Sequence, residues 1–172
     1  GKHQASNAAA ALVAVEAFFG EQELDYEAVL AGFANVQSPG RCEVLHRDPT
    51  IILDAAHNPH GAAAIADTIQ SEFTFDEVIG IFAAMADKDV EGALVELEKV
   101  MDSVIVTKNS SSRSMPVDEI EKIATSIFGA DRVFASDNLE EAIEKAIKDS
   151  ERPLSEDTLG ILITGSVVTV GE

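Results

Sequence analysis

Cysteine and basic residues are scarce in this sequence of 172 residues, and each shortage excludes a class of protein. The single cysteine, Cys42, cannot form an internal disulfide, and a cysteine-rich zinc site is excluded with it. Twelve basic residues stand against 31 acidic ones, which gives a formal net charge of −19. Such a surface cannot neutralise many phosphates, so we expect no nucleic-acid partner and no binding to an anionic membrane.

Long apolar segments and the common nucleotide-binding loops are also missing. The longest mostly apolar run, residues 8–19, is too short to cross a bilayer, and no signal peptide is recognisable. We therefore expect a cytoplasmic protein. Neither G-x-x-x-x-G-K-[ST] nor G-x-G-x-x-G occurs, so the main phosphate-binding loop of any ATP site would lie outside this chain. The sequence opens on Gly1-Lys2-His3 rather than Met, and we expect a fragment of a longer protein.

The composition supports a packed core, because 46% of the residues are hydrophobic and no long low-complexity run occurs. Two helical patterns come first, at residues 5–19 and from Asp25 to about residue 35, and Ser38-Pro39-Gly40 then interrupts them. We place a domain boundary there. The predicted domains are residues 1–38 and residues 39–172.

Beyond this boundary, apolar segments typical of strands alternate with amphipathic helical patterns of about 10 to 15 residues. This alternation predicts an α/β fold, a three-layer sandwich with a mostly parallel, Rossmann-like sheet. The segments at 50–53 and 159–164 are apolar throughout and should be central strands. The other expected strands lie at residues 42–46, 78–84, 103–107, 133–135 and 167–170.

The strongest site signal lies in residues 51–61, where an apolar segment ends in Asp54 and leads through His57 into an alanine-rich helix. Asn58 suits the helix N-cap and Pro59 the first helical position. Ligands of open α/β sheets bind at such strand-to-helix crossings, so Asp54 is predicted to accept from ribose hydroxyls or to hold a cation. The alternative is an aspartate satisfied by nearby helix N–H groups.

The two histidines of this stretch, His57 and His60, do not make a convincing metal site. Pro59 and the helix start turn their rings in different directions, and no fourth ligand is evident. We predict that the imidazoles form hydrogen bonds and that this chain holds no metal. Two further turns follow strands: Asp87-Lys88-Asp89 is predicted to cap a helix, and residues 110–114 to form a polar loop.

Two other positions suit anionic ligands. Arg41 follows Pro39-Gly40, and its planar guanidinium can bind phosphate oxygens in a bidentate manner, although a solvent-facing arginine fits the sequence equally well. Gly165-Ser166 ends the last buried strand in a tight turn, which can present a backbone N–H and a hydroxyl to a carboxylate.

Taken in order, the short motifs of this chain share their spacing with one family. They are Gly1-Lys2-His3-Gln4-Ala5-Ser6-Asn7-Ala8-Ala9, Pro39-Gly40-Arg41, Leu53-Asp54-Ala55-Ala56-His57-Asn58-Pro59-His60, Met85-Ala86-Asp87-Lys88-Asp89, Ser112-Arg113-Ser114 and Gly165-Ser166. The set resembles the C-terminal part of bacterial folylpolyglutamate synthase/dihydrofolate synthase, in the Mur ligase superfamily. Ala55 replaces the family's usual glycine and Ser112 its usual proline.

The resemblance implies an ATP-dependent ligase of folate biosynthesis and one-carbon metabolism. Such an enzyme joins L-glutamate to folate or dihydropteroate through an acyl phosphate, with ATP and Mg²⁺ as cofactors. By resemblance, Asn7 contacts the adenine, Arg41 the terminal phosphate and Asp54 the ribose. His57, the catalytic candidate, and Ser166 hold the incoming glutamate.

The same resemblance implies that this chain is incomplete as an enzyme. Residues 1–38 would be the last helices of the central ATPase domain, and the missing N-terminal ATPase region would supply the P-loop and the metal ligands. We therefore expect the chain alone to be inactive. Two alternatives remain open from the sequence: the C-terminal domain of a peptidoglycan Mur ligase, and a non-catalytic α/β interaction domain whose acidic surface binds a basic partner.

Overall fold

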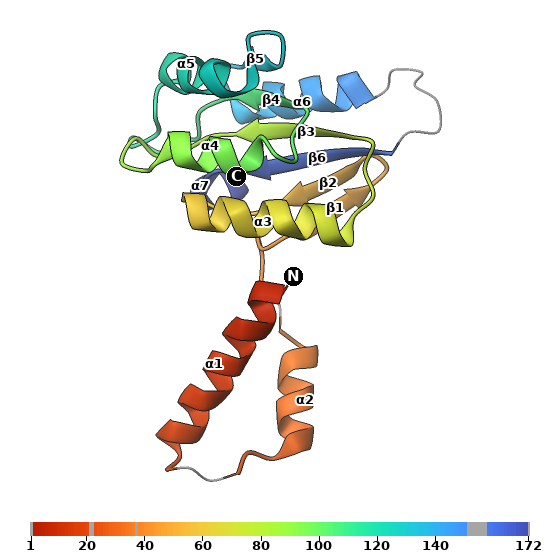
Figure 1. Ribbon diagram of the computed structural model, residues 1–172, viewed down its shortest axis with the longest axis vertical. Helices are drawn as coiled ribbons and strands as arrows, with labels where there is room; N and C mark the ends of the chain where they lie inside the picture. The colour runs from red at the N-terminus through yellow and green to blue at the C-terminus, as the bar shows by residue number, and fades with distance from the viewer. Residues whose placement is uncertain (1, 21–22, 37, 151–157, 172) are drawn as a thin grey trace. The chain divides into compact units, whose positions relative to one another are not determined.

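The computed structural model describes residues 2–20, 23–36, 38–150 and 158–171. The chain divides into two compact units, residues 1–39 and residues 40–172 (Figure 1). Among the described residues, no helix is both long enough and apolar enough to span a bilayer.

The first unit is a pair of helices, α1 (Lys2–Phe18) and α2 (Tyr26–Ala34). Alanine, the strongest helix former, fills much of α1, and Gly20 follows its end with φ +74°. The α2 helix starts at the predicted cap, since Asp25 Oδ1 accepts from the backbone N of Ala28 at 3.0 Å. Both helices that the sequence predicts in this region are confirmed.

The second unit is built on a six-stranded sheet with the strand order β1-β2-β6-β3-β4-β5 (Figure 1). The edge strand β1 pairs antiparallel with β2, and every other neighbouring pair is parallel. The strands are β1 (Glu43–Arg47), β2 (Thr50–Leu53), β3 (Glu77–Phe82), β4 (Ser103–Val106), β5 (Val133–Ala135) and β6 (Leu159–Thr164).

Helices cover both faces of this sheet, which confirms the predicted three-layer α/β sandwich. One apolar core joins the sheet to α3 (Pro59–Glu72), α4 (Val90–Leu97) and α5 (Val117–Phe128). A second core joins the other face to α6 (Leu139–Ser150). A short helix, α7 (Val167–Val170), follows β6.

The alternation of side chains along β6 explains why its sequence is apolar without interruption. Leu162 belongs to the core under α3–α5, whereas Ile161 and Ile163 belong to the core under α6. The strand lies between β2 and β3, so both of its faces are buried, as predicted for a central parallel strand.

One local prediction is wrong. Residues 167–170 form α7 rather than a strand, because Gly165 turns the chain at φ +109° and the hydroxyl oxygen of Ser166 caps the helix by accepting from Val168 N. The valines of this segment favour a strand only where a neighbouring strand can pair with them. At the start of α6, Asn138 is the capping residue, since its Oδ1 accepts from Glu141 N at 2.9 Å.

Candidate functional site

The site is organised around the turn between β2 and α3. The ladder of β2 and β6 continues one residue past β2, where Asp54 N donates to Ile163 O at 3.0 Å. After this turn Asn58 adopts the extended conformation of an N-cap, and its Oδ1 accepts from Gly61 N at 2.8 Å. Pro59 is the first helical residue. The predicted N-cap and first position of the helix are therefore confirmed.

The half-buried carboxylate of Asp54 is tied to backbone on two sides. Its Oδ2 accepts from Cys42 N at 2.9 Å and its Oδ1 accepts from Ala56 N at 2.9 Å. The sequence offered helix N–H groups as the alternative partners, but neither of these donors belongs to a helix. Hydrogen bonds to an ionised acceptor are about twice as strong as neutral ones, so these two contacts fix the carboxylate in place.

Arg41 lies in a loop whose backbone is anchored at the preceding residue, Gly40. Gly40 O accepts from Ala55 N at 2.7 Å, and Gly40 N donates to Glu43 Oε2 at 2.8 Å. The Arg41 side chain is exposed. The loop therefore holds a guanidinium at the surface, beside the turn that contains Asp54.

The neighbouring thiol, Cys42, is not a reactive group. Burial raises the pKa of the Cys42 thiol, and the negative charge of Asp54 raises it further. The thiol therefore stays protonated near neutral pH, and a protonated thiol is a poor nucleophile.

The ring of His57 is exposed and held by one backbone contact. Its Nδ1 lies 3.0 Å from Ala55 O, and a carbonyl oxygen can only accept, so Nδ1 carries the proton. In the neutral ring this leaves Nε2 as an acceptor.

Ser166 is buried next to the same turn. Gly165 N donates to Ala56 O at 3.0 Å, which joins the end of β6 to the residues that follow β2. Gly165 is required here, because a Cβ at its φ of +109° would lie 2.5 Å from Ala83 O. The hydroxyl oxygen of Ser166 caps α7 by accepting from Val168 N at 3.1 Å.

The second unit thus brings together four of the predicted site residues, Arg41, Asp54, His57 and Ser166, on three loops at the carboxyl ends of β2 and β6. The fifth, Asn7, belongs to α1 in the first unit. Its exposed side-chain amide donates to Gln4 Oε1 at 3.1 Å.

The sequence did not reveal a set of buried polar residues that follow the carboxyl ends of β4 and β6. Asn109 Nδ2 donates to Thr169 Oγ1 at 3.2 Å, which links the loop after β4 to α7. Thr107 Oγ1 is buried without a hydrogen-bond partner among the described residues. The available signal was a run of polar residues, Thr107-Lys108-Asn109, directly after a buried strand.

The loops after β3 and β4 are also joined by an ion pair. Arg113 Nη2 donates to Asp87 Oδ2 at 2.7 Å, and Ala86 N donates to Arg113 O at 2.9 Å. The hydrogen bond from Arg113 lowers the pKa of the Asp87 carboxyl below its ordinary value. As predicted, the same turn caps a helix, since Asp89 Oδ1 accepts from Gly92 N at 2.9 Å.

Metal ligands do not gather in the described part of the chain. No group of three or more His, Cys, Asp or Glu side chains is arranged there to hold a metal ion. Asp54, His57 and His60, which the sequence brought close together, therefore form no such cluster.

The family model for the glutamate ligase domain of Mur ligases matches residues 40–167 of this sequence. This chain belongs to the Mur ligase family. The matched residues include the whole sheet and all three loops. The first loop carries Arg41, the second carries Asp54 and His57, and the third carries Ser166.

Relatives of this Mur ligase chain include a dihydrofolate synthase/folylpolyglutamate synthase of Mycobacterium tuberculosis, which is 46% identical over 182 residues. The alignment covers 99% of this chain and 37% of the relative. The chain therefore spans well under half the length of that protein.

Solved structures of similar proteins share the fold. Mycobacterium tuberculosis folylpolyglutamate synthase complexed with ADP and AMPPCP has a TM-score of 0.94 at 48% identity, over 99% of this chain and 39% of that one. A folylpolyglutamate synthase/dihydrofolate synthase from Yersinia pestis, complexed with AMPPNP and a Mn ion, has a TM-score of 0.68 at 25% identity, over 87% and 34%. Nucleotide and metal are thus bound by these relatives.

Proposed function

We propose that this chain is the C-terminal, glutamate- and nucleotide-binding part of an ATP-dependent ligase that adds L-glutamate to folates or to dihydropteroate. The observation that carries the proposal is the meeting of three loops at the carboxyl ends of β2 and β6. Two backbone hydrogen bonds hold these loops together: Ala55 N donates to Gly40 O, and Gly165 N donates to Ala56 O. They present a guanidinium, a carboxylate and an imidazole where open α/β sheets bind ligands.

The reaction proceeds through an acyl phosphate. The folate carboxylate attacks the terminal phosphorus of ATP, and the bond to the bridging oxygen breaks to release ADP. The glutamate amine, after losing a proton, attacks the acyl carbon, and inorganic phosphate leaves as the amide forms. Both steps move negative charge among phosphoryl oxygens, so fixed cationic groups and correct positioning supply most of the catalysis.

Arg41 is the fixed cation that this chain contributes. An arginine fork matches the oxygens of a terminal phosphate in a bidentate manner, and the anchored backbone of Gly40 limits the entropy lost on binding. The carboxylate of Asp54, which Cys42 N and Ala56 N hold in place, accepts from the ribose hydroxyls. Asn7 contacts the adenine with its side-chain amide.

His57 and Ser166 bind the incoming glutamate. With Nδ1–H donating to Ala55 O, the Nε2 atom of His57 accepts from the glutamate amine and orients it for attack. The Ser166 hydroxyl donates to a glutamate carboxylate while its oxygen keeps α7 capped. These two contacts place the amine next to the acyl phosphate.

Magnesium is the proposed metal cofactor, and its ligands would be supplied by the region that precedes this chain in the longer protein. The metal would neutralise phosphate charge. The described residues offer no cluster to hold it, and the Yersinia pestis relative was crystallised with a nucleotide analogue and Mn.

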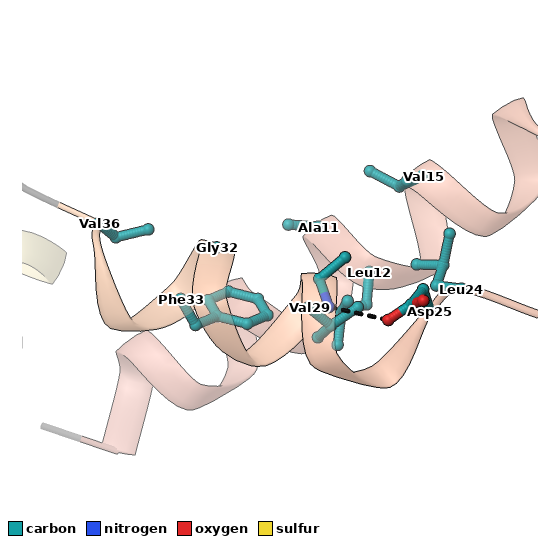
Figure 2. A pocket seen from close by; sticks show the side chains of 10 residues that line it. Ala11, Leu12, Val15, Leu24, Asp25, Val29, Gly32, Phe33 and Val36 are labelled. Atoms are coloured by element: carbon teal, nitrogen blue, oxygen red, sulfur yellow. Dashed lines mark hydrogen bonds between the residues drawn. The ribbon is translucent and has the colours of Figure 1, made fainter.

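The first unit fits the proposal that residues 1–38 are the last helices of the central ATPase domain. Eight of the twelve exposed large hydrophobic side chains among the described residues lie between Val13 and Val36. An apolar groove of about 440 Å³ lies between α1 and α2, lined by side chains such as Leu12, Val29 and Phe33 (Figure 2). Apolar surface of this kind requires a partner, and the missing ATPase domain is the proposed one.

A ligation assay tests the proposal. The purified chain should release no phosphate with ATP, folate and glutamate, whereas the full-length, cytoplasmic enzyme should. In that enzyme Arg41→Ala should lower kcat/KM by about 100-fold or more, the size of effect seen when a transition-state donor is removed. Arg47→Ala is the matched control, because Arg47 pairs with Thr50 at the opposite end of β2. Full activity of Arg41→Ala, or ligation of a UDP-sugar peptide in place of folate, would contradict the assignment.

A further inference from the structure

We propose that Asp54 is a positioning residue for Arg41 and acts through the backbone of the loop from Gly40 to Cys42. The inference rests on the proposed role of Arg41 at the terminal phosphate. It adds to Asp54 a task that a ribose contact does not require: to hold the guanidinium of a neighbouring loop where the phosphate binds.

The backbone on both sides of Arg41 is in the left-handed region. Gly40 has φ +67° and Cys42 has φ +50°. Among the described residues, Cys42 is the only non-glycine residue with a positive φ. This conformation is unfavourable for a residue with a Cβ, so the loop needs contacts that hold it there.

Asp54 supplies the contact at the strained residue itself. Its Oδ2 accepts from Cys42 N at 2.9 Å, while its Oδ1 accepts from Ala56 N at 2.9 Å. One carboxylate therefore joins the residue after Arg41 to the turn that follows β2. On the other side of Arg41, Gly40 O accepts from Ala55 N at 2.7 Å, so the same turn holds both flanks.

The loop is packed closely against α7 at Gly40. A Cβ at Gly40 would lie 2.4 Å from Val170 Cγ1, which shows how closely the loop approaches α7. Gly40 N also donates to Glu43 Oε2 at 2.8 Å. The start of the Arg41 side chain is thus fixed before any nucleotide binds, and only its rotamers remain to be ordered.

A double-mutant cycle in the full-length ligase separates this role from an independent ribose contact. Asp54→Asn keeps the shape but leaves one acceptor oxygen for two backbone donors, so the bridge between Cys42 N and Ala56 N is broken at one end. At saturating ATP, we expect Asp54→Asn to lower kcat at least tenfold, and to lower the kcat of Arg41→Ala less than twofold further. If the effects of the two substitutions on kcat multiply in the double variant, Asp54 acts independently of Arg41 and the inference is overturned. Asp48→Asn, in the exposed turn between β1 and β2, is the control and should retain full activity.

Hydrogen exchange in the present chain supplies a readout that does not depend on activity. Asp54→Asn should speed exchange of the Cys42 or the Ala56 amide at least tenfold, while the Gly61 amide, which Asn58 holds, should be unchanged. Unchanged exchange at both Cys42 and Ala56 would overturn the inference. Faster exchange at Gly61 would also overturn it, because the substitution would then loosen the whole turn.

The two proposals fail in different ways. Full activity of Arg41→Ala would refute the phosphate role and hence the proposed function of Arg41. An impaired Arg41→Ala enzyme in which Asp54→Asn costs a further tenfold would leave the proposed function intact and refute only the positioning role.

Discussion

At the scale of single residues, backbone groups rather than side chains hold this site together. Of the four predicted site residues in the second unit, Asp54, His57 and Ser166 are all hydrogen-bonded to main-chain atoms. Main-chain partners do not depend on the rotamer of a second side chain, so the site geometry is largely preformed by the fold. Such preformed groups lose little entropy when a ligand binds.

A substitution at Gly40 tests how closely the Arg41 loop packs against α7. Gly40→Ala introduces a Cβ at φ +67° and 2.4 Å from Val170 Cγ1. We expect a loss of about 2 to 4 kcal/mol in the free energy of unfolding, from the left-handed backbone and the overpacking together. Urea denaturation measures it. The double variant Gly40→Ala/Val170→Ala should recover part of the loss, and no recovery would place the cost in the backbone alone.

The Asp87–Arg113 pair makes a pH-dependent contribution. The hydrogen bond from Arg113 lowers the pKa of Asp87 in the folded chain below the ordinary value of 3.8. The stabilisation is therefore present at pH values above that value and is lost as the pH falls through the folded pKa. The melting temperature of Arg113→Ala should lie below that of the wild type at pH 7, and the difference should vanish once the pH has fallen below the lowered pKa of Asp87.

The control for this pair is the substitution of its other partner. In an Asp87→Asn background, Arg113→Ala should leave the pH dependence of the melting temperature unchanged. A remaining pH-dependent difference would assign the effect to another carboxylate.

At the scale of elements, the sequence predicted what local patterning controls. Continuous apolar runs identified β2 and β6, and Asn58-Pro59 identified the start of α3. The α7 segment escaped because its valines carry a strand signal, whereas the turn at Gly165 and the cap at Ser166 direct the chain into a helix. That outcome depends on the surrounding fold, which no local pattern records.

The N-cap of α3 gives a direct test of how firmly the site turn is closed. Asn58→Ala removes the acceptor for Gly61 N and should cost about 1 kcal/mol, whereas Asn58→Asp should keep most of the stability. Thermal unfolding followed by circular dichroism measures both. Equal losses in the two variants would mean that packing of Asn58, and not its capping oxygen, stabilises the turn.

The site itself was only partly predictable. Arg41, Asp54 and Ser166 are separated in sequence, and their proximity follows from the pairing of β2 with β6, which the sequence did not specify. The link from Asn109 to Thr169 joins loops 60 residues apart and is likewise a product of the sheet order. Strand ends could be recognised, but which of them are neighbours could not.

At the scale of the whole molecule, the chain combines a well-packed α/β unit with a helical pair that exposes apolar surface. The two cores of the second unit lie entirely within residues 40–172. The helical pair, in contrast, has no buried residues along α2 and leaves Phe18 83% exposed. Stability and exposed apolar surface are therefore carried by different parts of the chain.

Deletion of residues 1–39 tests this division. The remaining chain should unfold cooperatively, with a melting temperature within about 3 °C of the intact chain, because its cores are retained and a shift of that size corresponds to about 1 kcal/mol. Binding of a hydrophobic dye should fall, since the groove lined by Leu12, Val29 and Phe33 is removed. Leu12→Gln in the intact chain should lower dye binding in the same direction without changing the melting temperature of the second unit. Loss of cooperative unfolding on deletion would show that the α/β unit depends on the helical pair, and unchanged dye binding would place the exposed apolar surface elsewhere.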